Sequence, residues 1–218
     1  MCNLYSMTKN QDAIRDLFKV KKDSAGNIPP MPGIFPNYRA PVVRMSDEGR
    51  ELTMIYRGMP GPPERGGYNT NIRHVSLPHW QQWMGPDNRC LIPATSFAEY
   101  AAEPDPATGK KDIIWFALSK ERPPFAFAGI WTEWNGNRGP AKNPTVTVHR
   151  LAYALLTTRP NAVVKPIHNN AMPVILLHED WETWLTADAK AAAKLQKPWP
   201  ADRIEIVARG SDKEDIAA

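Results

Sequence analysis

The cysteine at position 2 has the most distinctive chemistry in this sequence. A residue this small allows methionine aminopeptidase to remove Met1, and Cys2 would then carry a free α-amine and a thiol on adjacent carbons. Such an aminothiol condenses with an aldehyde to an imine, which the thiol closes to a stable thiazolidine ring. An α-amine titrates near ~8 and a thiol near ~8.5, so both reactive forms exist at neutral pH. The alternative is that Cys2 is an incidental second residue without chemistry.

Other candidate residues are scattered along the chain. Glu99 follows Phe97 by two positions in an alternating segment, so we expect both side chains on one face of a strand. This would place a carboxylate beside an apolar side chain, although an exposed glutamate on an edge strand fits the same pattern. His168 lies in an expected loop, and Asn71 precedes Arg73 in a short ordered segment. Residues of these types, far apart in sequence, can form an assembled active site or reflect chance.

Several familiar motifs are absent from the sequence. We find no glycine-rich phosphate loop, no dinucleotide-binding fingerprint and no nucleophile-elbow serine. His74 and His79 lack the helical spacing and the third ligand of a zinc site. We therefore expect neither a metal nor a cofactor, and we interpret Cys90 as a buried packing residue.

Composition is typical of a soluble globular protein. The 218 residues are 42% hydrophobic and 23% charged, which is enough for one domain with a substantial core. A formal charge of +4 and a pI near 9.1 permit a polyanionic partner without requiring one. With no apolar run of membrane-spanning length, no signal peptide and only two cysteines, we expect a cytoplasmic protein without membrane contact.

Periodicity and turn residues predict many short strands and few helices. A capping box at Thr8–Gln11 predicts a helix over 9–19. Strands are expected at 42–45, 51–56, 90–94, 96–100, 113–118, 125–134, 145–157 (one long strand or a pair) and 172–176, and helical segments at 78–84, 179–185 and 187–196. We expect one domain over residues 1–208 and a polar, frayed tail over 209–218.

Several short segments together carry a family resemblance. In order, they are Met1-Cys2, Asn37-Tyr38-Arg39-Ala40-Pro41, Asn71-Ile72-Arg73, Cys90-Leu91-Ile92-Pro93-Ala94, Phe97-Ala98-Glu99-Tyr100, Thr157-Thr158, and His168 before Ala171-Met172-Pro173-Val174-Ile175-Leu176. This order, over most of the chain, resembles the SRAP family, the SOS-response-associated peptidases or abasic-site-processing proteins. With the predicted elements, we expect an α+β fold: a single compact domain with a mixed, barrel-like β-sheet core flanked by short helices.

The resemblance implies a function and a site. In that family the mature N-terminal cysteine crosslinks covalently to the ring-opened aldehyde of an abasic site in single-stranded DNA, which protects the lesion. By position, Cys2 would be the nucleophile, with Asn71, Glu99 and His168 as its catalytic pocket. The expected protein is a monomeric, nucleoid-associated crosslinking enzyme that forms a thiazolidine, with weak lyase activity as a side reaction.

The chain departs from the common family pattern near the expected DNA surface. The usual Cys-Gly-Arg start is Cys2-Asn3-Leu4 here, so an arginine beside the nucleophile is missing. Arg57 stands where many members have the tryptophan of a Trp-Gly pair. We expect Arg39 and Arg57 to replace the lost phosphate contact, and Arg73 to face a flanking phosphate.

Two other functions are consistent with the sequence. One is a cysteine peptidase that uses the terminal amine as its base and processes itself. The other is a non-covalent single-stranded DNA-binding protein, whose affinity would come from phosphate charge and aromatic stacking.

Overall fold

A closed ring of five strands forms the centre of the structure. The computed structural model describes residues 3–139 and 146–215. In pairing order, the ring strands are β13 (Thr147–Thr158), β12 (Phe125–Asn137), β9 (Arg89–Ala94), β4 (Arg39–Ser46) and β5 (Gly49–Arg57). These neighbours are antiparallel, and the ring closes where β5 pairs in parallel with β13, with Ala152 opposite Tyr56. The predicted mixed barrel is therefore confirmed.

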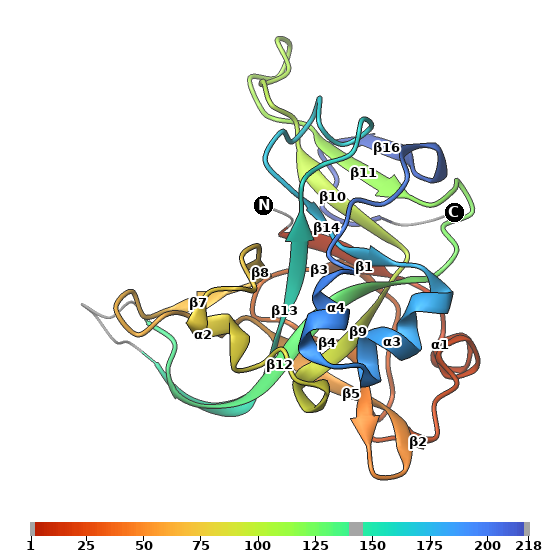
Figure 1. Ribbon diagram of the computed structural model, residues 1–218. Coiled ribbons are helices and arrows are strands. Elements are labelled where there is room, and N and C mark those ends of the chain that lie inside the picture. The colour runs from red at the N-terminus through yellow and green to blue at the C-terminus, as the bar shows by residue number, and fades with distance from the viewer. Residues whose placement is uncertain (1–2, 140–145, 216–218) are drawn as a thin grey trace.

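A second, five-stranded sheet packs against the barrel (Figure 1). Its strands, in order, are β16 (Glu205–Gly210), β11 (Ile113–Ala117), β10 (Ser96–Tyr100), β1 (Leu4–Met7) and β3 (Met31–Ile34). Only Thr95 separates β9 from β10, and its amide donates a hydrogen bond to the Ser6 carbonyl (2.7 Å). The chain thus passes directly from a barrel strand into the second sheet.

Shorter elements complete the fold. The short strands are β2 (Lys22–Asp23), β6 (Met59–Pro60), β7 (Tyr68–Asn69), β8 (Asn71–Ile72), β14 (Met172–Pro173) and β15 (Ile175–Leu176). The helices are α1 (Gln11–Phe18), α2 (Pro78–Gln81), α3 (Trp181–Thr186) and α4 (Ala189–Ala193), with 3-10 turns at Pro86–Asn88, His178–Asp180 and Ala201–Arg203. In the described part of the chain, no helix is long and apolar enough to cross a membrane.

Helix α1 shows how local sequence produces these elements. Its N-cap is Asn10, not Thr8 as the capping box predicted: the Asn10 side chain accepts a hydrogen bond from the Ala13 amide (2.8 Å). The helix ends at Lys19, which adopts a left-handed conformation (φ 51°). Phe18 is buried and stacks on Trp181 with ring centroids 4.4 Å apart, so α1 and α3 pack together.

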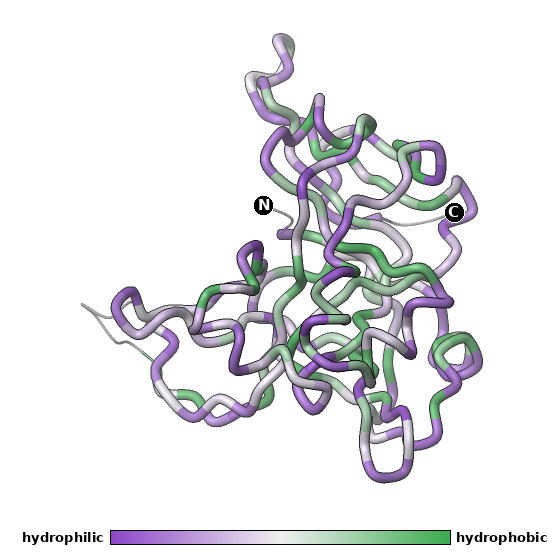
Figure 2. The backbone as a smooth tube through the Cα atoms, viewed as in Figure 1, coloured by the Kyte–Doolittle hydropathy of each residue, from purple (hydrophilic) through white to green (hydrophobic). Residues whose placement is uncertain are grey.

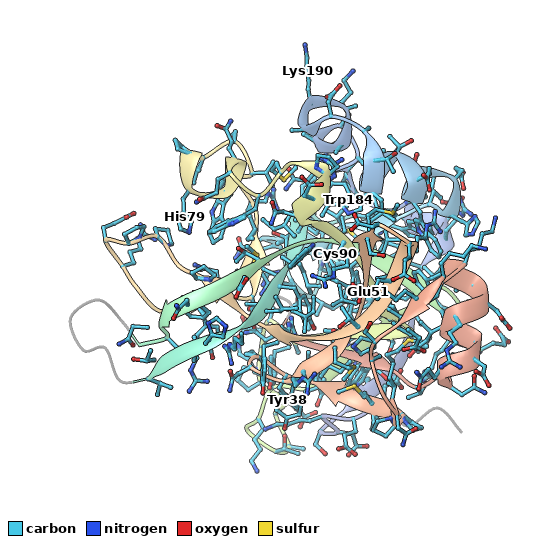
Figure 3. All side chains as sticks on the ribbon, turned by 90° about the horizontal axis from the view of Figure 1, so that it is seen from below. Tyr38, Glu51, His79, Cys90, Trp184 and Lys190 are labelled. Atoms are coloured by element: carbon cyan, nitrogen blue, oxygen red, sulfur yellow. The ribbon has the colours of Figure 1, made fainter. Side chains whose placement is uncertain are left out.

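Buried apolar side chains form the core of the barrel. Hydrophilic segments lie mainly on the outer loops (Figure 2). Cys90 lies in the interior near Trp184 (Figure 3), and its carbonyl accepts a hydrogen bond from the Trp184 indole (2.9 Å). Burial raises the pKa of the Cys90 thiol far above its ordinary value. Cys90 is therefore a packing residue, as predicted, and its thiolate is strongly disfavoured.

The end of the described chain is ordered, and the expectation of a frayed tail from Arg209 is wrong for its described part. Strand β16 continues to Gly210, which pairs with Ile113 of β11. Asp215 is buried: its carboxylate accepts hydrogen bonds from the Ser96 hydroxyl and from Arg122 Nε (2.8 Å). The ordered domain thus extends beyond the predicted boundary at residue 208, because the buried Asp215 carboxylate, paired with the partly buried Arg122, anchors the segment that follows β16.

We expect Asp215→Ala to lower the free energy of unfolding by about 3 kcal/mol, because it leaves the Arg122 charge without its buried partner. Urea unfolding followed by tryptophan fluorescence measures the change. Asp212→Ala, which removes an exposed carboxylate from the same segment, is the matched control. Equal stability of the two variants would contradict an anchoring role for Asp215.

Candidate active site

A cavity of about 560 Å³ lies where β1 and β10 meet the loop that carries His168. Glu99 and His168, which are far apart in sequence, both line it. The full lining is Asn3, Glu99, Tyr100, Ala101, Ala102, Lys111, Lys165, Pro166, Ile167, His168 and Asn169. The structure therefore brings two of the predicted catalytic residues together beside the start of the chain.

Strand pairing and burial set the properties of Glu99. It lies on β10, an interior strand between β1 and β11, and is only 3% exposed, so the alternative of an exposed glutamate on an edge strand is wrong. Burial raises the pKa of Glu99 to about 7, and the positive charge of Arg57 acts in the opposite direction. At neutral pH this carboxyl can therefore both accept and donate a proton.

A capped turn presents His168. The Asn161 side chain accepts hydrogen bonds from the amides of Val163 (3.1 Å) and Val164 (3.0 Å), which starts the turn leading to the histidine. His168 Nδ1 lies 3.0 Å from the Ala171 carbonyl oxygen and 3.2 Å from its amide nitrogen. These contacts hold the ring in place through Nδ1. Burial lowers the pKa of His168, which favours the neutral ring at physiological pH.

Asn71 reaches the same end of the molecule from β8. Its amide nitrogen donates to the Thr70 hydroxyl (2.9 Å) and, at 3.4 Å, to the side-chain oxygen of Asn3. Its own oxygen is buried and accepts no hydrogen bond from any described residue. Asn71 is thus linked to the cavity through Asn3 and keeps an unused acceptor.

Arg57 lies inside the molecule rather than on its surface, so the expectation that it contacts DNA is not supported. Its side chain is fully buried, and Nη1 donates to the carbonyls of Asn3 (3.0 Å) and Ile34 (2.9 Å). Its guanidinium also lies 5.0 Å from the centre of the Tyr5 ring. Arg57 therefore ties barrel strand β5 to the beginning of the chain.

The other two arginines expected to contact DNA differ in position. Arg73, directly after β8, donates from Nη1 to the Asn170 carbonyl (3.2 Å) and so contacts the loop that carries His168. Arg39 is exposed on β4, outside the cavity lining, with its guanidinium 5.8 Å from the Tyr56 ring centre.

Two lysines at the cavity were missed by sequence reasoning. Lys111 donates to the Ala102 carbonyl (2.6 Å), and Lys165 lies in the turn before His168. Lys165 could have been found from its position three residues before the histidine, whereas Lys111 belongs to a polar loop with no distinguishing motif. Cys2, the predicted nucleophile, lies outside the described residues and directly precedes Asn3 in the sequence.

Comparison with protein families gives a match over nearly the whole chain. The family described as SOS response associated peptidase (SRAP) matches residues 1–210. The chain belongs to the SRAP family. Curated relatives in Bacillus subtilis include the abasic site processing protein YoqW, 29% identical over 94% of this chain and 90% of the relative. A second is the abasic site processing protein YoaM, 27% identical over 94% and 89%.

Solved structures show the same fold. A Bordetella bronchiseptica protein matches this SRAP chain with a TM-score of 0.70 and 23% identity, covering 97% of this chain and 99% of that one. A Bacteroides thetaiotaomicron protein gives a TM-score of 0.70 at 20% identity, with 94% and 90% covered.

If Arg57 holds the beginning of the SRAP domain, Arg57→Met should loosen β1. The carbonyls of Asn3 and Ile34 would lose a donor, and for the buried Ile34 carbonyl the cost is about 1–3 kcal/mol in the free energy of unfolding. Hydrogen exchange at the Leu4 and Tyr5 amides should become faster than in the wild type. Arg39→Met, which changes an exposed arginine on the neighbouring strand, should leave that exchange unchanged. Unaltered exchange in Arg57→Met would contradict the assignment.

Proposed function

We propose that this chain captures abasic sites in single-stranded DNA by covalent attachment to Cys2 after removal of Met1. One observation carries the proposal: Asn3, the residue directly after Cys2, lines the same cavity as Glu99 and His168. Membership of the SRAP family and the names of the Bacillus relatives support abasic DNA as the substrate.

The first chemical step is opening of the sugar. An abasic deoxyribose is mostly a closed hemiacetal, and ring opening moves a proton from the anomeric hydroxyl to the ring oxygen. His168 suits this transfer because its ring is oriented through Nδ1 and its lowered pKa keeps Nε2 able to accept a proton.

Glu99 serves the next steps. Its carboxylate takes a proton from the Cys2 α-ammonium, and the amine attacks the aldehyde to give a carbinolamine. The protonated carboxyl then returns the proton to the departing hydroxyl, so one water leaves and a protonated imine (iminium) forms. The Cys2 thiol adds to the iminium carbon and its proton passes to the Glu99 carboxylate, which closes the thiazolidine with its nitrogen neutral. The pKa of about 7 fits a group that must act in both directions.

Neighbouring side chains position the reactants. The unused Asn71 oxygen is suited to accept a hydrogen bond from the amine or from a sugar hydroxyl. Arg73, at the His168 loop, and Lys165, at the cavity, supply positive charge for a flanking phosphate. The imine could also lose its 3′ phosphate by β-elimination, and closure of the thiazolidine competes with this weak lyase reaction.

The decisive variant is Cys2→Ala. Incubation with a single-stranded oligonucleotide carrying one abasic site should give a one-to-one adduct that survives heating in denaturant, and Cys2→Ala should abolish it. Denaturing electrophoresis measures the adduct. Cys90→Ala is the matched control and should still crosslink, because Cys90 is buried in the core. A processed N-terminus without an adduct would overturn the proposal.

The pH dependence tests the role of Glu99. Because burial raises its pKa to about 7, the carboxylate fraction grows as pH rises through that value. The crosslinking rate should therefore increase between about pH 6 and about pH 8, with a step near 7.

Glu99→Gln should remove that step and slow the reaction at neutral pH by about 10²-fold. The more gradual increase in rate with pH that comes from deprotonation of the Cys2 α-ammonium should remain. Single-turnover rates measured across the pH range give the result. A wild-type step that persists in Glu99→Gln would assign the ionisation to another group.

A further inference from the structure

A second concave surface lies away from the Glu99 cavity, beside the hairpin of β12 and β13. This hairpin groove has a volume of about 330 Å³ and is lined by Asn37, Tyr56, Arg138, Val146, Val148, His149 and Arg150. None of these residues lines the Glu99 cavity, and the chemistry proposed above uses none of them.

Arg150 is held in the hairpin groove by aromatic rings. Its guanidinium carbon lies 4.5 Å from the Tyr56 ring centre and 5.5 Å from that of Trp134. Nη1 donates to the Asn37 side-chain oxygen (2.6 Å). Nε and Nη2 are buried and have no hydrogen-bond partner among the described residues. The side chain is thus fixed in place while two of its donor nitrogens are unused.

The positive charge of the hairpin groove has little compensation. Arg138 lies close enough to oppose the Arg150 charge, and burial together with this repulsion lowers the pKa of Arg150. In the described part of the chain, neither arginine has a carboxylate within 4.0 Å; the nearby Glu133 is 3.4 Å from His149 instead. Two like charges held together at a concave surface favour an anionic ligand.

Aromatic rings beside this charge are accessible to a ligand. The Arg138 guanidinium lies 6.0 Å from the ring centre of Tyr68, which is 38% exposed. Tyr38, next to Asn37 in sequence, is 49% exposed and lies at the edge of the molecule (Figure 3). Proteins that bind single-stranded nucleic acid combine positive groups, which contact the phosphates, with exposed aromatic rings, on which the bases stack.

Contacts connect the hairpin groove to the Glu99 cavity. Asn37, which holds Arg150, donates its amide to the Arg57 carbonyl (2.8 Å), and the Arg57 side chain donates to the Asn3 carbonyl (3.0 Å). On β13, Arg150 lies five residues before Leu155, which pairs with Asn71 of β8. At the usual rise per residue of a strand, this separation is roughly 16 Å. A single DNA strand bound at the Glu99 cavity needs to extend only a few nucleotides to reach the hairpin groove.

We propose that the hairpin groove is a second DNA-binding site, where Arg150 and Arg138 bind backbone phosphates of the undamaged strand that flanks the lesion. The inference rests on the proposed function for the identity of the strand. The groove uses charge and stacking, so it binds without regard to base sequence. It would supply affinity for DNA in a chain that lacks an arginine next to its nucleophile.

Binding of an undamaged single-stranded oligonucleotide, measured by fluorescence anisotropy, tests the proposal. Such DNA has no aldehyde, so the result does not depend on crosslinking. Arg150→Gln should raise the Kd by about tenfold through loss of a charge-assisted contact. It should also lower the slope of log K against log salt by about 0.7. Arg138→Gln removes the second charge without disturbing the aromatic contacts of Arg150, and it should act in the same direction.

Arg203→Gln is the matched control, because Arg203 also lies against an aromatic ring, Trp199 at 5.2 Å, but belongs to a different surface. It should bind like the wild type. Wild-type affinity in folded Arg150→Gln and Arg138→Gln would overturn the proposal. Inorganic phosphate that competes as strongly as the oligonucleotide would assign the groove to a small anion, which also contradicts it. The two proposals can fail separately. If these variants bind DNA more weakly but the wild-type protein forms no adduct with abasic DNA, the groove is a DNA-binding site and the crosslinking function is rejected.

Discussion

The structure depends on holding the beginning of the chain as an interior strand. Terminal segments usually fray because few contacts restrain them. Here β1 pairs with β10 on one side and β3 on the other, and Arg57 hydrogen-bonds to the Asn3 carbonyl from inside the fold. A guanidinium is a costly group to bury, so this position makes sense only where its charge and donors are used. The result is an ordered Asn3 at the wall of the cavity, next in sequence to Cys2.

The second constraint is the one-residue connection between barrel strand β9 and β10 of the second sheet. Because Thr95 alone separates β9 from β10, Glu99 is fixed relative to the barrel that also carries Arg57. Burial raises the pKa of the Glu99 carboxyl to about 7, and the positive charge of Arg57 limits this rise. Arg57 thus contributes to both the backbone position and the electrostatics of the site. Its backbone also contacts Asn37, which orients Arg150 in the hairpin groove.

Much of the fold follows from local sequence signals, while the contacts between distant segments do not. Alternation predicted the strand that carries Glu99, and helical periodicity predicted α1. The family resemblance named Glu99 and His168 together, and the structure brings both to one cavity. Arg57 was expected to contact a DNA phosphate because it stands where many family members have the tryptophan of a Trp-Gly pair. Its burial depends on the carbonyls of Asn3 and Ile34, which no local pattern reveals. The ordered segment between β16 and Asp215 was missed for the same reason, since Asp215 depends on Ser96 and Arg122.

Cys2 is the proposed nucleophile, and peptide mapping of the adduct tests this role most directly. After reaction with abasic single-stranded DNA and nuclease trimming, trypsin should release the peptide from Cys2 to Lys9 carrying the sugar, with the loss of one water. Fragmentation should place the sugar on Cys2, and the linkage should be stable without a reducing agent because a thiazolidine has no imine left to reduce. Attachment at Lys165 or Lys111, or a linkage that survives only after borohydride reduction, would contradict the account.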